Sequence, residues 1–173
     1  MTERQKYSTL KDYGAFELRE YDPCVIAEMT IDADYGSASN RAFGSLFKYI
    51  SQGNSSSSKI SMTAPVIAAT TSSIDSMEWK VSFVMPAGSL RKDLPDPNDS
   101  SVVLREIPRQ ECVALHFKGR GSKATWQEKE ADLRRLAASE GLHLSNETRI
   151  CRFDPPFKPG FLHYNEVVIP LLL

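Results

Sequence analysis

The sequence has no long apolar segment of the kind that marks a membrane or exported protein. No apolar run approaches the roughly 20 residues that a membrane-spanning helix needs, and the closing run 169–173 is far too short. Residues 1–14 carry charges but not the apolar stretch of a secretory signal. We therefore expect a cytoplasmic protein that does not insert into a membrane.

The sequence also has few cysteines and no excess of basic charge. Cys24, Cys112 and Cys151 are widely spaced and form neither a disulfide framework nor a CxxC metal motif. They are typical of reduced, buried, small apolar residues. The formal net charge is −1, from 21 Lys and Arg against 22 Asp and Glu. Because nucleic-acid binding usually needs a clearly basic face, we expect no nucleic-acid partner.

The familiar motifs of catalysis are missing as well. The sequence contains no Gly-x-Ser-x-Gly element, no glycine-rich phosphate loop before a helix, and no cluster of metal ligands. What remains is the composition of one folded domain, with 41% hydrophobic and 25% charged residues over a length of 173. A binding protein is therefore expected rather than an enzyme.

An internal repeat organises the chain. Leu-Arg-Glu occurs at 18–20 and again at 104–106, and Cys-Val occurs at 24–25 and 112–113. Further along, the apolar run that ends at Pro86 matches the run that ends at Pro170, and Met-Thr-Ala-Pro at 62–65 parallels Phe-Asp-Pro-Pro at 153–156. Because four landmarks recur in the same order at similar spacing, we interpret the chain as a duplication.

The sequence pattern of each half predicts elements in the order strand, helix, strand, strand. In the first half we expect strands at 15–21 and 24–31, a helix at 37–52 with Ser37 as its N-cap, and strands at 59–70 and 77–85. In the second we expect a strand pair within 102–118, a helix at 125–140 that starts with a Thr125–Glu128 capping box, and strands at 149–153 and 165–172.

These elements predict an α+β fold. The duplicated β-α-β-β units would form a distorted antiparallel β-barrel with two flanking helices. The two halves, 11–87 and 102–173, would be joined by a proline-rich connector at 88–101 and would make up one domain over 1–173.

The first helix has an unusually wide apolar surface. At about 100° per residue, Ala42, Leu46, Tyr49 and Ile50 fall on one side, and Phe43 and Phe47 lie on its flank. Asn40 lies beside Phe47 on the helical wheel, and Lys48 lies further round. This rim would suit a flat apolar ligand with acidic substituents. Alternatively, both phenylalanines belong to the core and Lys48 is simply solvated.

Several of these segments together resemble the SOUL haem-binding family. They are the helix segment 42–50, the Gly53-Asn54 loop, Lys-Ile-Ser-Met-Thr-Ala-Pro-Val at 59–66, the strand 79–86, Tyr21, and Phe-Asp-Pro-Pro-Phe-Lys-Pro at 153–159 followed by Asn-Glu-Val at 165–167. The resemblance covers nearly the whole chain from about residue 11.

The resemblance implies reversible binding of haem or protoporphyrin for buffering or transport, with the tetrapyrrole lying against the first helix and its neighbouring loops. Carried over to this sequence, it points to Phe43, Phe47 and Lys48 as binding residues. Asn40, with Arg41 adjacent, occupies the position of a second basic residue in some relatives. His116 and His143 are expected to be structural, which leaves His163 as the candidate axial ligand.

Two other functions remain open. The same architecture resembles gyrase-inhibitor-like domains, which bind small molecules between their halves. There, Glu166 on the last strand would be a counter-charge or the general base of a hydrolase; alternatively, it holds neighbouring backbone or an arginine. The third possibility is a protein-interaction module that uses the exposed apolar residues of the first helix.

Overall fold

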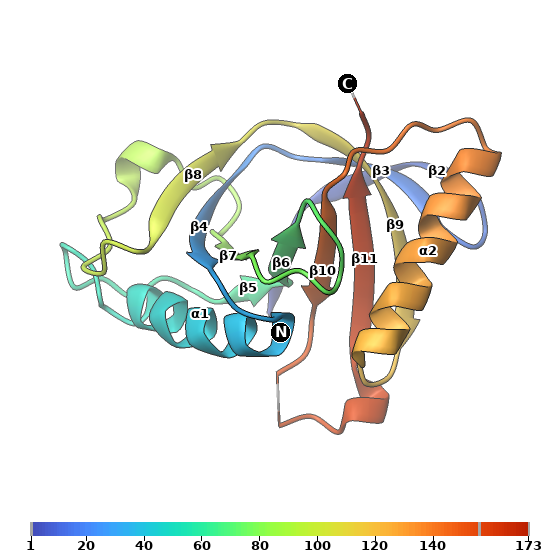
Figure 1. The fold of residues 1–173 in the computed structure, drawn as a ribbon. Coiled ribbons are helices and arrows are strands. Elements are labelled where there is room, and N and C mark those ends of the chain that lie inside the picture. Colours follow the sequence, from blue (N-terminus) through green and yellow to red (C-terminus); the bar gives the residue numbers. More distant parts are fainter. Residues whose placement is uncertain (1, 156, 173) are drawn as a thin grey trace.

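A computed structural model describes residues 2–155 and 157–172, and Pro156 of the repeat lies outside this part. It has an α+β fold with a curled antiparallel sheet and two helices, which confirms the predicted class (Figure 1). In chain order its elements are β1 (Glu3–Arg4), β2 (Tyr7–Asp12), β3 (Glu17–Tyr21), β4 (Cys24–Ile31), α1 (Tyr35–Ile50), β5 (Thr63–Ala64), β6 (Val66–Thr70), β7 (Trp79–Val84), η1 (Arg91–Asp93), β8 (Val103–Ile107), β9 (Gln110–Lys118), α2 (Lys123–Ser139), β10 (Thr148–Arg152), η2 (Gly160–Leu162) and β11 (Tyr164–Pro170).

Apart from the edge strand β2, the strand order is symmetric about the pair β6–β10. The nine-stranded sheet runs β2-β3-β9-β11-β10-β6-β7-β4-β8, and all of its pairings are antiparallel. β3 from the first half pairs with β9 from the second, whereas β8 from the second half pairs with β4 from the first. Two units that exchange one strand each would give this order. The boundaries of the halves at 11–87 and 102–173 remain predictions.

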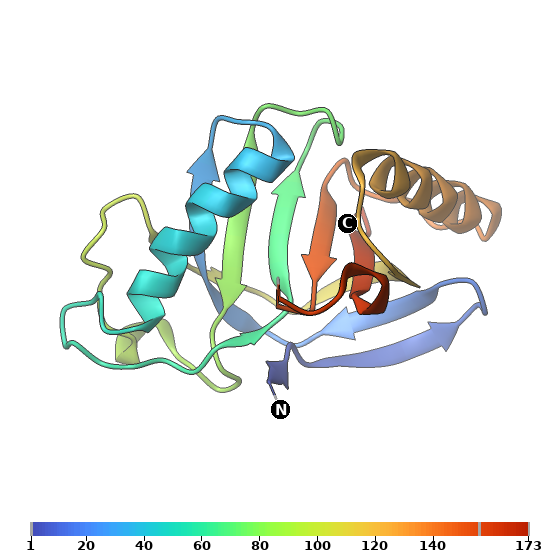
Figure 2. The same ribbon diagram turned by 90° about the horizontal axis from the view of Figure 1, so that it is seen from below.

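The two faces of the sheet are covered differently. α1 and α2 lie on the same face, as Figure 2 shows. This face holds the larger core, which includes Trp79, Val81, Phe83, Ile150 and Val167. The helices contribute Ala38, Ala42, Leu46, Tyr49 and Ile50 from α1 and Trp126, Leu133 and Ala137 from α2. The opposite face has a smaller apolar cluster and carries polar side chains as well.

Helix α1 begins two residues earlier than the sequence predicts. Asp34 is its N-cap, and the Asp34 carboxylate accepts a hydrogen bond from the backbone N–H of Ser37 at 2.9 Å. The prediction of Ser37 as N-cap was therefore wrong, because Tyr35-Gly36 forms the first helical turn instead of a separate turn. The hydrogen bond from the Ser37 N–H lowers the pKa of the Asp34 carboxyl.

Helix α2 also starts earlier than predicted. Its N-cap is Ser122, whose hydroxyl accepts a hydrogen bond from the Thr125 N–H at 3.2 Å, so Thr125 lies within the first turn. The prediction of a Thr125–Glu128 capping box was wrong. At the other end, Gly141 follows the C-cap with φ of 78°, a left-handed conformation that glycine adopts without strain. This agrees with the predicted helix end.

The position of this cap can be tested by mutation. We expect Ser122→Ala to lower the free energy of unfolding by about 1 kcal/mol, because the Thr125 N–H loses its acceptor. Thr125→Ala is the matched control and should have a smaller effect. Urea unfolding followed by circular dichroism measures both variants. A larger loss of stability for Thr125→Ala would contradict Ser122 as the N-cap and support the capping box instead.

The strands match the predictions with three exceptions, one of which is the unpredicted two-residue strand β1. The segment expected to be one strand at 59–70 is divided at Pro65 into β5 and β6. β2 was not predicted at all. Its residues are all exposed, so the sequence has no alternation between buried and exposed positions to indicate a strand.

A buried asparagine fixes the chain that leaves α1. Asn54 is 2% exposed, and its side-chain amide donates hydrogen bonds to the carbonyl oxygens of Tyr49 and Ser58 at 2.8 and 2.9 Å. The Tyr49 hydroxyl donates to the carbonyl oxygen of Pro95 at 2.8 Å, which ties the connector to the helix. The end of α1 is therefore held on two sides by side-chain to backbone hydrogen bonds.

The three cysteines are free, as the sequence analysis expected. Cys112 and Cys151 are buried and Cys24 is partly buried. Burial raises the pKa of the Cys112 thiol to about 11, which keeps the thiol protonated and unreactive at neutral pH. In the part of the chain that the structure describes, no helix is long and apolar enough to cross a membrane.

Candidate functional site

The outer flank of α1 exposes two aromatic rings. Phe43 is 37% and Phe47 is 47% exposed. The ring centroids lie 5.9 Å apart, and the ring planes are inclined by only 12°. Phe43 also packs edge-on against the buried Phe83 of β7, with 5.4 Å between ring centroids. The aromatic pair is thus anchored in the core at one end and faces solvent at the other.

The helix that carries the aromatic pair also carries exposed polar and basic residues. Asn40, Arg41 and Lys48 are exposed on α1. None of the ion pairs formed within 2–155 and 157–172 involves Arg41 or Lys48. Both cations are therefore available to an acidic group that approaches the rings. We call Asn40, Arg41, Phe43, Phe47 and Lys48 the α1 rim.

The loop between β10 and β11 is also rich in exposed apolar side chains. Phe157 is 89% and Phe161 is 73% exposed, and Leu162 follows at 47%. Figure 2 shows this loop on the same face of the sheet as the two helices. Sequence analysis had assigned the segment to the family motif but had not identified its exposed side chains.

His163 lies at the end of this loop with one ring nitrogen already engaged. Its Nε2 is 2.7 Å from the carbonyl oxygen of Lys158. Because a carbonyl oxygen can only accept, Nε2 donates in this conformation and cannot ligate iron. Among the residues described, no group of three or more His, Cys, Asp or Glu side chains could hold a metal ion. Axial ligation by His163 remains a prediction, through Nδ1 or after a rotation of the ring.

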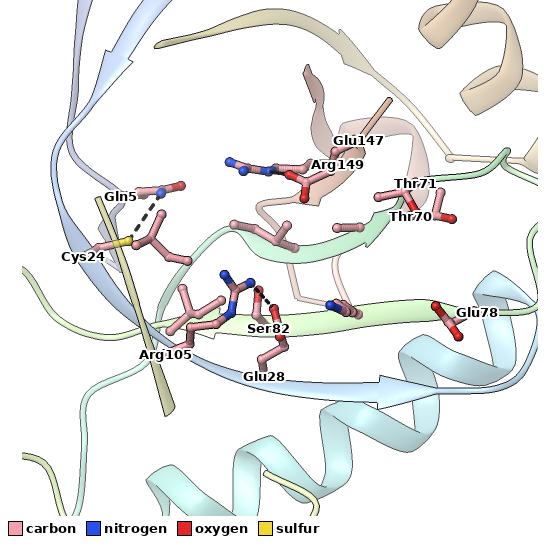
Figure 3. Close-up of a pocket in the computed structure, with 15 residues that line it drawn as sticks. Gln5, Cys24, Glu28, Thr70, Thr71, Glu78, Ser82, Arg105, Glu147 and Arg149 are labelled. Atoms are coloured by element: carbon pink, nitrogen blue, oxygen red, sulfur yellow. Dashed lines mark hydrogen bonds and ion pairs between the residues drawn. The ribbon is translucent and has the colours of Figure 1, made fainter. Parts of the chain in front are cut away.

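A cavity of about 350 Å³ lies on the face opposite the helices (Figure 3). β4, β6, β7, β8 and β10 all contribute to its walls, so the sheet curls around it. Arg105 and Arg149 extend into the cavity, and each is paired with a carboxylate. Arg105 donates to Glu28 at 2.8 Å, and Arg149 donates to Glu147. We call this cavity the concave groove.

Glu166 lies beyond one end of the concave groove, in a second, much smaller cavity. Glu166 is 3% and Arg19 2% exposed, and the Arg19 guanidinium donates to both carboxylate oxygens at 2.8 and 2.9 Å. The Tyr164 hydroxyl donates to Glu166 Oε2 at 2.7 Å. The Tyr7 ring covers the guanidinium, with 4.0 Å from Cζ to the ring centroid. Glu166 is therefore held by an arginine, as one of the two sequence-based interpretations proposed.

This ion pair changes the acid–base chemistry of its neighbours. Burial and the hydrogen bond to Glu166 raise the pKa of the Tyr164 phenol. The pKa of Arg19 is also raised, because its hydrogen bonds and charge interactions with Glu166, Tyr21 and Glu17 together outweigh burial, which lowers it. Tyr164 and Arg19 therefore keep their protons at neutral pH.

The structure does not bring the predicted site residues together in one place. The α1 rim and the concave groove lie on opposite faces of the sheet, and α1 contributes no residue to the walls of the concave groove. The residues of the concave groove were missed from the sequence. Their signal was weak, because Lys80 and Ser82 alternate with apolar residues, the ordinary pattern of a strand with one polar face.

Comparison with known proteins indicates haem-binding relatives. A family model described as SOUL heme-binding protein matches residues 2–170. The protein named heme-binding protein 1 from Xenopus laevis is 27% identical over 152 residues, which cover 86% of this chain and 80% of the relative.

Solved structures with lower identity share the fold. The EcmrR C-terminal domain has a TM-score of 0.71 at 14% identity, covering 96% of this chain and 98% of that chain. A structure described as a hydrolase from Listeria innocua has a TM-score of 0.62 at 14% identity, covering 94% of each chain. At this identity the likeness establishes the architecture alone.

Proposed function

The chain belongs to the SOUL haem-binding protein family, and from this premise we propose that it binds haem or protoporphyrin reversibly on the α1 rim. The observation that carries the proposal is the exposure of Phe43 and Phe47 as a nearly parallel pair. Had both rings been part of the core, no flat ligand could stack on them.

The α1 rim offers the two interactions that a porphyrin needs. The aromatic pair provides apolar surface, and burying such surface contributes roughly 25 cal/mol per Å² before ordering costs. Lys48 and Arg41 offer positive charge without a competing carboxylate partner to the propionates at the porphyrin edge. The exposed Phe157 and Phe161 of the β10–β11 loop lie on the same face of the sheet and would supply a second apolar wall.

We expect the binding to be reversible, as buffering or transport requires. The sequence contains no CxxCH motif for covalent attachment, and the buried, protonated Cys112 and Cys151 thiols are poor iron ligands. An exposed surface on a helix also releases a ligand more readily than an enclosed cavity does. When haem is bound, its iron supplies the redox and ligand chemistry. The residues of this chain hold and orient the macrocycle.

Absorbance titration tests the proposed function. Haem added to the purified protein should give a Soret shift that saturates at one equivalent, and protoporphyrin should compete for the same site. Uptake that does not saturate would mean non-specific adsorption to the exposed aromatic rings. In that case, the protein-interaction module becomes the better explanation of the α1 rim.

Reversing the charge of Lys48 should weaken haem binding. We expect Lys48→Glu to raise the haem Kd about twofold to tenfold at low salt, because a solvent-exposed charge pair contributes about 0.2–1 kcal/mol. The effect should shrink as the ionic strength rises. Lys92→Glu, which makes the same change at an exposed position in η1, is the matched control. An equal effect of both variants would show that only the overall charge matters.

A further inference from the structure

The concave groove has a polar end and an apolar end. At one end, Lys80 of β7 lies beside the small residue Ala69 of β6, because the two residues pair across neighbouring strands. Arg149 of β10 also pairs with Ala69, but its guanidinium extends away from Ala69 and donates to Glu147, Gln110 and Cys112. Glu78, Thr70 and Thr71 lie at the same end (Figure 3). The other end is lined by Ile26, Ile67, Ile107, Cys24 and Gln5.

Unused hydrogen-bond donors extend into this groove. Ser82 is 4% exposed, lines the groove next to Lys80 on the same face of β7, and its hydroxyl has no hydrogen-bond partner among the described residues. Because the Ser82 hydroxyl is not one of the fully buried polar atoms without a partner, it is accessible from the groove and can bond to a ligand or a water. Lys80 makes no ion pair with any residue that the structure describes. Arg105 uses one of its nitrogens on Glu28 and keeps the others free.

The carboxylates near the groove are mostly occupied. Glu28 and Glu147 are paired with Arg105 and Arg149, and Glu166 beyond the apolar end is paired with Arg19. Glu78 is the exception, but its side chain is exposed at the edge of the concave groove. An organic cation would therefore find no free buried carboxylate, whereas an anion would find free donors from a lysine, an arginine and a serine. The groove selects for negative charge.

We propose that the concave groove is a second ligand site, independent of the haem site, and that it takes a small amphipathic carboxylate. The carboxylate would lie between Lys80 and Arg105, close to the Ser82 hydroxyl, and the apolar part would lie on Ile26, Ile67 and Ile107. A volume of about 350 Å³ falls at the lower end of the range for small-molecule sites, about 300–1,000 Å³. The sheet itself separates this ligand from the α1 rim.

A matched set of probes tests the sign of the charge. The fluorescent anion 2-naphthoate, the cation 2-naphthylmethylammonium and the neutral 2-naphthylmethanol share one ring system and differ only in the polar group. Calorimetric titration of the full chain should show 2-naphthoate binding at one equivalent, at least about tenfold more tightly than the cation. Equal or tighter binding of the cation would overturn the proposal.

Variants place the probe in the groove. Ala69→Leu fills the groove beside Lys80 and should weaken 2-naphthoate binding at least about tenfold. Lys80→Gln, an exposed substitution that does not threaten folding, should weaken it about threefold to tenfold, and Lys92→Gln should leave it unchanged. Full affinity in Lys80→Gln and in a folded Ala69→Leu would refute the site. The haem Soret titration of both variants should match that of the unaltered protein, so a failure here is distinguishable from a failure of haem binding.

Discussion

Replacing Phe43 and Phe47 together by serine is expected to weaken haem binding at least about tenfold. A phenylalanine side chain presents about 150–250 Å², and roughly 150 Å² of the two rings is exposed. Covering that area contributes at most about 4 kcal/mol to the binding free energy, and the costs of ordering and of imperfect contact reduce this value. The Soret titration measures the loss, since a tenfold change corresponds to about 1.4 kcal/mol.

Two controls separate loss of contact from loss of structure. Leu10→Ser removes an apolar side chain that is 47% exposed, the same fraction as for Phe47, but lies on β2 instead of α1. It should leave haem affinity unchanged. Phe47→Ser alone spares the contact between Phe43 and Phe83, so it should melt like the unaltered protein and still bind more weakly. Unchanged affinity in the folded double variant would remove the aromatic pair from the site.

Breaking the buried ion pair should produce the largest loss of stability. We expect Glu166→Ala to lower the free energy of unfolding by about 3–5 kcal/mol, because it leaves the Arg19 charge buried with only Glu17, a partly exposed carboxylate, as an ionic partner. Urea unfolding followed by intrinsic fluorescence measures the change. A loss below about 1 kcal/mol would contradict the structural role assigned to Glu166.

The paired substitution is the informative control. Arg19→Met with Glu166→Met replaces both charges by apolar side chains and should recover most of the stability lost by Glu166→Ala. Glu166→Gln addresses the hydrolase alternative. If the protein has a hydrolase activity that depends on Glu166 as a base, that variant would lose turnover while it remains folded.

The elements of the fold were largely predictable because hydrophobic periodicity is a local signal. The buried face of α1 could be identified from residues one turn apart, and the glycine after α2 marked its end. The N-caps were predicted less well. Ser37 and Thr125 are acceptable N-cap residues by type. Asp34 and Ser122 are the N-caps because of the direction in which the preceding segment enters each helix.

The pairing of distant segments could not be predicted. The exchange of β3 and β8 between the halves brings together segments whose local sequences carry no record of their partners. Arg19 and Glu166 are likewise 147 positions apart. The concave groove escaped prediction for the same reason, since Lys80 of β7 and Arg105 of β8 come close only because both strands pair with β4.

Exposure of the α1 rim was the part of the site that the sequence left undecided. The helical wheel placed Phe43 and Phe47 on a flank, where either solvent or another element can cover a side chain. The structure shows both rings partly exposed, on a helix that also exposes Arg41 and Lys48. The tetrapyrrole proposal depends on this exposure.

Paramagnetic broadening by ferric haem tests the location of the haem most directly. In an amide-resolved NMR spectrum of the labelled protein, substoichiometric haem should first broaden the signals of residues 40–48, followed by those of the β10–β11 loop. The signals of Lys80 and Ser82, across the sheet, should stay sharp. Broadening centred on the concave groove, with residues 40–48 unaffected, would contradict the account.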